Sequence, residues 1–280
     1  MTATVLTDAL AASAAELVRA GSITVPRLTF YRVPPEMVRG GYPIGKHTPN
    51  GMPLRALMVH PEVWPAFRVV APRIVITDLT RTAESSLSRM KTAPGLTQAP
   101  GYSHHNAGGA FDLDIMASVK HGGYRNRAAM DEDLIELGFP PFWWLAGANA
   151  PPPNKPGSET WHHSWLTRDL HMREPHGRST AAAAEALMLR WYPWLDVSTW
   201  TDKARTAQYC LARLGHYHGA IDGAFGPLSR TALAMFQRAL QVRSWCRKKG
   251  ISNYQEGVLD AATARVLAFV AAERDIVPAP

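Results

Sequence analysis

The sequence is poor in cysteine, with only Cys210 and Cys246 among 280 residues. Two cysteines do not make a disulfide framework, and without a Cys-x-x-Cys pair neither a thiolate zinc site nor redox chemistry is supported. We expect both to be free thiols that act as small apolar core residues. Long apolar runs are also lacking, since no stretch approaches the roughly 20 residues that would span a membrane. The N-terminus has no basic region and carries Asp8 early, so no secretory signal is expected.

Potential metal ligands are concentrated in residues 103–112, SHHNAGGAFD. His105 and Asp112 enclose a small, glycine-containing run that lets the backbone turn back tightly. From Phe111 to Ile115 apolar and acidic residues alternate, which predicts a half-buried strand. This alternation places Asp112 and Asp114 on one face of that strand.

A second segment, residues 159–162 (ETWH), supplies another carboxylate three residues before a histidine. Two imidazoles and one carboxylate suit zinc, and three protein ligands leave a fourth position for water, as in catalytic sites. A spare carboxylate can then act as a general base toward that water. His104 and His163 adjoin His105 and His162, so the residue types alone leave open which histidine of each pair binds the metal.

The combined pattern, Ser-x-His-x-x-Gly-x-Ala-x-Asp with a downstream Glu-x-Trp-His, resembles the D-alanyl-D-alanine carboxypeptidase (VanY-like) zinc peptidases. That family cuts bacterial peptidoglycan peptides and includes many phage endolysins. The fixed positions correspond to Ser103, His105, Gly108, Ala110, Asp112, Glu159, Trp161 and His162. The resemblance implies one zinc ion per chain, held by His105, Asp112 and His162, with Glu159 as the catalytic base. Ser103 and Trp161 of the motif are further candidates for supporting the ligands or contacting the substrate. Asp114, beside Asp112, is a candidate for orienting a ligating histidine, and His163, beside His162, for lining the cleft.

The family usually has an arginine after an early strand, which grips the substrate carboxylate. Residues 73–78 read as a β-branched strand, and Arg81 follows it, so Arg81 is our candidate for this role. The alternative is that Arg81 merely pairs with Asp78 or Glu84.

The C-terminal part carries an independent signal between residues 204 and 267. Apolar residues recur at helical spacing, and Asp222-Gly223 and Gly226-Pro227 mark tight turns between helices. This part resembles the three-helix peptidoglycan-binding domain of wall hydrolases. The resemblance assigns wall binding to a motif of seven residues: Asp222, Gly223, Phe225, Gly226, Thr231, Phe236 and Gln237.

The two resemblances agree on one substrate, bacterial peptidoglycan. They imply a hydrolase that cleaves the stem peptide, with the C-terminal module raising the effective concentration of polymer at the active site. Both D-Ala-D-Ala carboxypeptidase and L-Ala-D-Glu endopeptidase activity are compatible with the motifs. The alternative function is a non-catalytic or virion-associated peptidoglycan-binding protein that retains the zinc fold.

The net charge of +7 lies mostly in the C-terminal part, where residues 201–280 hold 11 Lys and Arg against 6 Asp and Glu. Such a basic module suits an anionic wall polymer. Nucleic acid is the competing interpretation of the charge, but no recognised nucleic-acid motif is present, and we expect no such partner. We expect a monomer without a membrane span. Without a signal, an endolysin-like protein would stay in the host cytoplasm until it is released to the periplasm or cell wall.

Short strands mixed with helices predict an α+β fold. We expect a zinc peptidase domain over residues 1–190, with a small antiparallel sheet and flanking helices. A linker over residues 191–202 and an all-α wall-binding domain over residues 203–280 would follow. Within this scheme, residues 9–18 and 179–190 are predicted helices, and residues 151–157 form a proline-rich loop.

Overall fold

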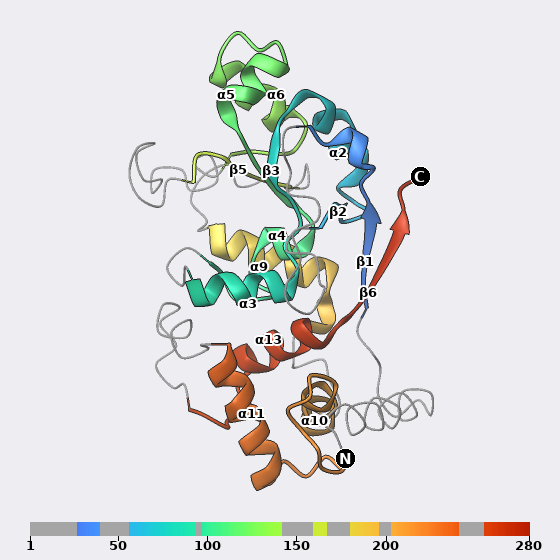
Figure 1. Cartoon of the computed structure of the whole chain (residues 1–280), viewed down its shortest axis with the longest axis vertical. Coiled ribbons are helices and arrows are strands. Elements are labelled where there is room, and N and C mark those ends of the chain that lie inside the picture. The colour runs from blue at the N-terminus through green and yellow to red at the C-terminus, as the bar shows by residue number, and fades with distance from the viewer. Residues whose placement is uncertain are drawn as a thin grey trace. The chain divides into compact units, whose positions relative to one another are not determined.

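The computed structural model (Figure 1) describes residues 27–39, 56–92, 97–141, 159–166, 180–195, 203–240 and 255–280. These residues fall into two compact units. One, here called the sheet unit, lies within Thr29–Ser86, Tyr102–Trp191 and Arg274–Pro280. The other, the helical unit, contains Leu87–Gly101 and Tyr192–Glu273.

The sheet that carries the histidine and aspartate motifs has three antiparallel strands with β4 at its centre. They are β3 (Ile76–Asp78), β4 (Ala110–Leu113) and β5 (His162–Ser164). The register pairs Asp112 with Asp78 on one side and with His162 on the other. Three polar residues from distant parts of the chain are therefore aligned across the sheet.

The apolar core of the sheet unit lies on the opposite face of β4. Phe111 and Leu113 are buried there, as the alternating pattern predicts for these residues. They pack with apolar side chains of α2 (Trp64–Val70) and α6 (Arg127–Glu136). The buried members of this core are Val33, Val59, Val63, Trp64, Phe67, Val70, Ala71, Ile74, Ile76, Leu79, Phe111, Leu113, Met130, Leu134 and Phe139.

A second sheet has the strand order β2-β1-β6. β1 (Arg27–Arg32) pairs antiparallel with β2 (Met58–Val59), and β6 (Glu273–Pro278) lies on its other side. Figure 1 shows the last strand of the chain beside the first described one. Arg274 of β6 also forms an ion pair with Glu84 at 3.1 Å, so the chain end after the C-terminal helices belongs to the sheet unit.

The remaining helices begin and end at local signals. The Asp114 carboxylate accepts a hydrogen bond from Ala117 N and caps α5 (Ile115–His121), and Asn126 caps α6 in the same way. The other helices before the C-terminal part are α3 (Ala83–Thr92), α4 (His104–Ala107) and α9 (Thr180–Trp191), with 3-10 turns η1 (Pro35–Met37), η2 (Ala71–Arg73) and η4 (Pro193–Leu195).

The C-terminal part of the helical unit consists of α10 (Lys203–Arg213), α11 (Pro227–Ala239) and α13 (Ala261–Ala271). A fully buried glutamine on each of the first two helices organises the loop that follows. Gln208 accepts from Gly223 N at 2.7 Å and donates to Ser229 at 3.1 Å. Gln237 accepts from Gly257 N at 2.7 Å and contacts Thr263 at 3.4 Å.

This repetition shows that the same loop-to-helix connection occurs twice. Ser229 and Thr263 are each the third residue of their helix. Gly223 and Gly257 both adopt positive φ, 81° and 77°, which a side chain would strain. The two halves of this region therefore share one hydrogen-bonding plan, although their sequences differ.

The predicted α+β class is confirmed, with two three-stranded sheets and nine α-helices among the residues that the structure describes. The helix predicted over residues 179–190 is α9. Within the described segments no helix is long and apolar enough to cross a membrane. The predicted helix at 9–18, the loop at 151–157 and Cys246 lie outside the described residues. The proposed domain boundaries stay a prediction.

Two strand predictions need correction. The first strand begins at Ile76 rather than Arg73, because Arg73 belongs to the 3-10 turn η2. The second ends at Leu113, because Asp114 leaves the sheet to cap α5 and Ile115 is already helical.

Candidate metal centre

The short helix α4 presents His105 to the site. Ser103 caps the helix, its hydroxyl accepting a 3.3 Å hydrogen bond from His105 N. Gly108 ends it at φ 76°, and a Cβ there would lie 2.7 Å from the backbone nitrogen of His60. The turn between the motif histidine and β4 thus requires glycine for both conformation and space.

A backbone carbonyl fixes the orientation of the His105 ring. Its Nδ1 lies 2.6 Å from the carbonyl oxygen of Leu79, the residue that follows β3. Because a carbonyl only accepts, Nδ1 carries a proton, and in the neutral ring Nε2 then has the lone pair. Histidines that bind metals almost always donate the N–H of their other ring nitrogen to a carboxylate, a backbone carbonyl or water.

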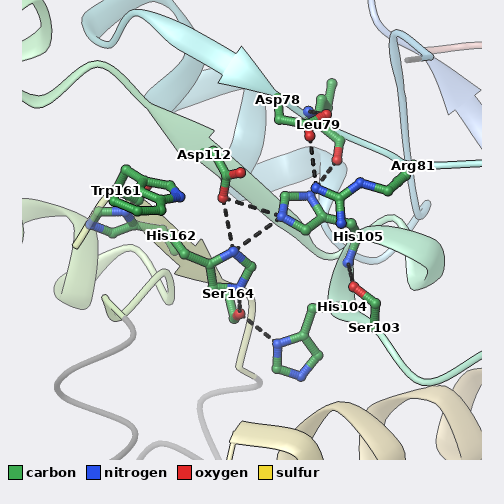
Figure 2. Close-up of polar contacts among 11 residues, drawn as sticks. Asp78, Leu79, Arg81, Ser103, His104, His105, Asp112, Trp161, His162 and Ser164 are labelled. Atoms are coloured by element: carbon green, nitrogen blue, oxygen red, sulfur yellow. Dashed lines mark hydrogen bonds and ion pairs between the residues drawn. The ribbon is translucent and has the colours of Figure 1, made fainter. Parts of the chain in front are cut away.

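His105 Nε2 is one of three potential ligand atoms that lie close together (Figure 2). His105 Nε2 lies 3.2 Å from Asp112 Oδ1 and 3.1 Å from His162 Nδ1, and the latter two atoms are 2.9 Å apart. His105 comes from α4, Asp112 from the central strand β4 and His162 from the neighbouring strand β5. The group can hold a metal ion.

The spacing fits zinc. Zinc binds imidazole nitrogen and carboxylate oxygen at about 2.0–2.1 Å, so two ligands at a tetrahedral angle lie about 3.3–3.4 Å apart. The three observed separations fall a few tenths of an ångström below that value. Three lone-pair donors this close repel one another unless a cation or a proton lies among them, and imidazole nitrogen and carboxylate oxygen are donors that zinc binds.

The electrostatics keep the carboxylate ionised. Burial acts to raise the pKa of Asp112, but the charges and hydrogen bonds of His105 and His162 outweigh it and hold the pKa well below its usual value. Asp112 is therefore available as an anionic ligand throughout the neutral range.

Glu159 lies on a strained turn before β5. Its φ of 36° is in the left-handed region, which a residue with a side chain adopts only at a cost of about 1–3 kcal/mol. The carbonyl of Glu159 accepts from His162 N at 2.9 Å, so the turn links the carboxylate residue directly to a candidate ligand. Glu159 itself is not a member of the three-residue metal group. Trp161, in the same turn, is 47% exposed.

A network on the far face of β5 anchors this turn. Arg127 of α6 donates to the Thr160 carbonyl at 3.0 Å and to the Asp131 carboxylate at 3.2 Å. Asp131 is buried and lies 3.5 Å from His163 Nε2. The turn that contains Glu159 is therefore held by two hydrogen bonds, one from the backbone of His162 and one from the side chain of Arg127.

His163 does not line the site. It is completely buried, and its ring stacks on Phe111 with a centroid separation of 5.6 Å. Burial lowers its pKa, so the ring is neutral inside the core. Consecutive strand residues point to opposite faces, which is why His162 faces the site and His163 cannot.

His104 and Asp114 are also placed outside the metal group. His104 Nδ1 hydrogen bonds to Ser164 Oγ on β5. The carboxylate of Asp114, which we expected to orient a ligating histidine, is engaged in capping α5. Among the described residues the outer partners of the ligands are the Leu79 carbonyl and Ser164 instead.

Arg81 lies beside the centre but is engaged in an ion pair. Its guanidinium donates to Asp78 at 2.8 Å, the pairing that the sequence left open as an alternative. Its backbone nitrogen donates to the carbonyl of His105 at 3.0 Å. Arg81 is 7% exposed, and its Nε has no hydrogen-bond partner among the described residues.

Several residues of this region were missed by sequence reasoning. Ser164 follows His162 at the strand period of two, a signal that places both on one face. Arg127 and Asp131 are spaced as a helical ion pair, but nothing in the sequence connects them to Thr160. The rings of His60 and Trp191 stack with their centroids 3.7 Å apart. The Glu62 carboxylate accepts hydrogen bonds from Trp191 and Arg190, so both residues attach α9 to the segment that contacts Gly108.

Comparison with known proteins identifies one part of the chain. The family described as "Putative peptidoglycan binding domain" matches residues 201–243. The chain carries a peptidoglycan-binding domain. No curated protein and no solved structure matches the chain.

The motif residues of this domain divide between surface and interior. Thr231 is exposed and Asp222 borders the first loop, where its carboxylate accepts from Gln208 and from Ala224 N. Gly226 caps α11. Phe236 and Gln237 are buried, so these two stabilise the domain and have no surface to offer a polymer.

Proposed function

We propose that the protein is a zinc-dependent peptidoglycan hydrolase that cleaves the stem peptide and is targeted by its peptidoglycan-binding domain. The observation that carries the proposal is the convergence of His105 Nε2, Asp112 Oδ1 and His162 Nδ1 at separations of 2.9–3.2 Å. The adjoining strained turn at Glu159 and the family match at residues 201–243 support the same conclusion.

Each residue of the site has a separate role in the proposed reaction. His105, Asp112 and His162 would hold the ion as its protein ligands. Zinc, when bound, lowers the pKa of a coordinated water toward neutrality and polarises a carbonyl. Glu159 takes a proton from the attacking water and returns it to the leaving amine. We propose that Trp161, which is 47% exposed and lies two residues after Glu159, forms part of the substrate-binding surface.

Arg81 is our candidate for binding a substrate carboxylate. Its proximity to His105 and its unsatisfied Nε favour this assignment. The buried ion pair with Asp78 gives the guanidinium a fixed direction, which suits recognition of a planar anion.

The binding domain would hold the enzyme at its polymer. A tether converts the encounter with each scissile bond into an intramolecular event and raises its effective concentration. We propose the peptidoglycan layer as the site of action, reached from the host cytoplasm by release, as for an endolysin.

The deciding experiment is mass spectrometry of purified peptidoglycan digested by the zinc-loaded protein, with Glu159→Gln and His105→Ala as controls. We expect new peptide ends with the wild type alone. Release of free D-alanine identifies a carboxypeptidase, whereas a newly exposed amine on D-glutamate identifies an L-Ala-D-Glu endopeptidase. Zinc should stay bound in Glu159→Gln, and its loss there would make Glu159 a ligand.

The second candidate is a non-catalytic wall-binding protein, which the match at residues 201–243 by itself favours. Intact muropeptides together with tight sedimentation on peptidoglycan would establish this function and reject the hydrolase. Detection of the protein in purified phage particles would identify a virion component.

A further inference from the structure

His162 is connected to a chain of buried polar side chains on the side away from the metal group. Its Nε2 lies 2.8 Å from Ser164 Oγ, and the same hydroxyl hydrogen bonds to His104 Nδ1. Figure 2 shows the three side chains in sequence, from His162 through Ser164 to His104. Ser164 is fully buried and His104 is 3% exposed.

The elements explain why these groups meet. His162 and Ser164 are two residues apart on β5 and so project from the same face. His104 and His105 are consecutive on α4, where successive side chains diverge by about 100°. His105 therefore points to the metal group while His104 points to Ser164.

The protons along this chain have one consistent arrangement when a metal occupies the site. Coordination through Nδ1 uses that lone pair, so the proton of the neutral His162 ring is on Nε2. Nε2–H can only donate, and Ser164 Oγ accepts. The single hydroxyl proton of Ser164 then donates to His104 Nδ1.

We propose that Ser164 and His104 are positioning residues of the metal centre, which fix the Nδ1-facing orientation and the Nε2–H tautomer of His162. The inference rests on the proposed metal site and adds to it how one ligand is held. His105 obtains the same support from a backbone carbonyl, which no substitution can remove, whereas His162 depends on two side chains. Outer partners of this kind typically contribute about 10- to 100-fold to metal affinity.

The test measures zinc affinity by competition with a chromophoric chelator, and the His162 tautomer by long-range ¹H–¹⁵N correlation of the zinc-loaded protein. We expect Ser164→Ala to weaken zinc binding at least tenfold. Ser118→Ala is the matched control, because Ser118 is also fully buried and hydrogen bonded, to Val75 N at 2.9 Å, but has no contact with the metal group. Its zinc affinity should stay within twofold of the wild type.

His104 is tested by two substitutions. Asn can place an oxygen acceptor near the position of His104 Nδ1, so His104→Asn should keep most of the affinity, while His104→Ala should weaken binding about tenfold. In the double variant Ser164→Ala/His104→Ala the losses should not add, because both act through one hydrogen-bonded chain.

The outcomes separate the two levels of the proposal. Failure of the wild type to bind zinc would reject the proposed function. Wild-type zinc affinity in Ser164→Ala, with an unchanged His162 tautomer, would overturn the positioning role alone and leave the peptidase proposal standing. Equal losses in His104→Asn and His104→Ala would also overturn it, since packing rather than the acceptor would then be responsible.

Discussion

The Nε2 atom of His105 lies 3.1 Å from Nδ1 of His162, although the two residues are 57 positions apart. Each ring has its other nitrogen hydrogen bonded, to the Leu79 carbonyl for His105 and to the Ser164 hydroxyl for His162. In the neutral rings, two lone pairs and the Asp112 carboxylate are then directed at one point. A cation among them would relieve their repulsion, so we expect a bound ion to stabilise the site.

Zinc should therefore stabilise the protein. At a free zinc concentration a thousandfold above Kd, binding adds about 4 kcal/mol to the free energy of unfolding. Differential scanning fluorimetry of chelator-treated protein, with and without zinc, measures the gain as an increase in Tm. His105→Ala should show almost no increase, and a wild-type increase in that variant would contradict the ligand set.

Arg127→Ala should reduce kcat about 10- to 100-fold while leaving zinc bound. The substitution removes the hydrogen bond to Thr160 O and frees the strained turn that carries Glu159. A base displaced by about 1 Å loses much of its effect. Steady-state kinetics on a stem-peptide substrate and metal analysis provide the measurement. Arg125→Ala is the control, because Arg125 is exposed and only two residues away. Unchanged kcat in Arg127→Ala would show that the turn holds its shape unaided.

Arg81→Lys should raise KM for peptides that end in a free carboxylate by more than tenfold, because lysine cannot form a bidentate contact. The effect on the matching C-terminal amide should be small, which makes the amide an internal control. Equal effects on both substrates would assign Arg81 to its ion pair with Asp78 alone. Arg81→Ala should also lower the free energy of unfolding by about 3–5 kcal/mol, since it removes the cationic partner of the buried Asp78 carboxylate.

Stability should fall as the pH drops below 6.5, in part because of His60. Burial, with the nearby charge of Arg190, lowers the pKa of His60 from 6.5 to about 4. Between these values the unfolded chain binds a proton that the folded protein does not, so stability decreases as the pH falls through this window and levels off below it. The contribution amounts to about 2 kcal/mol between pH 7.5 and pH 5.

The variant His60→Phe isolates this effect. Phenylalanine keeps a ring against Trp191 and does not titrate. Urea unfolding at pH 7.5 and pH 5 should show a smaller loss of stability in the variant than in the wild type. Identical losses would mean that His60 does not contribute to the pH dependence.

Gln208→Leu and Gln237→Leu should each destabilise the C-terminal helices by about 2–3 kcal/mol, because each removes the hydrogen-bond partner of a glycine N–H, part-buried at Gly223 and buried at Gly257, and of several acceptors. Binding to purified peptidoglycan should weaken in parallel at temperatures near the Tm. Gln255→Leu, at an exposed position, is the control. Loss of binding in Gln208→Leu but not in Gln237→Leu would confine the binding domain to the segment before residue 243.

Local structure was largely predictable from the sequence. The two glycines and the alternation after Phe111 indicate a turn that enters a strand, and the structure has one there. The alanine-rich helix and the turns at Gly223 and Gly226 were predicted for the same reason, since caps and turns depend on neighbours within a few residues. The boundaries at Arg73 and Asp114 were misplaced, because β-propensity continues past the point where a 3-10 turn or a helix cap takes over.

The sequence by itself determined which kinds of chemistry this chain carries: two histidine pairs, two carboxylates of the motifs and a basic C-terminal module. The family resemblance chose His105 and His162 from the two pairs, but only the tertiary structure supplies the physical reason for that choice. Strand alternation turns His162 toward Asp112 and buries His163 against Asp131, and the helical rotation at α4 separates His105 from His104. The same packing brings Arg127 to Thr160 and β6 to β1. These contacts depend on register between segments far apart in the chain, which no local pattern specifies.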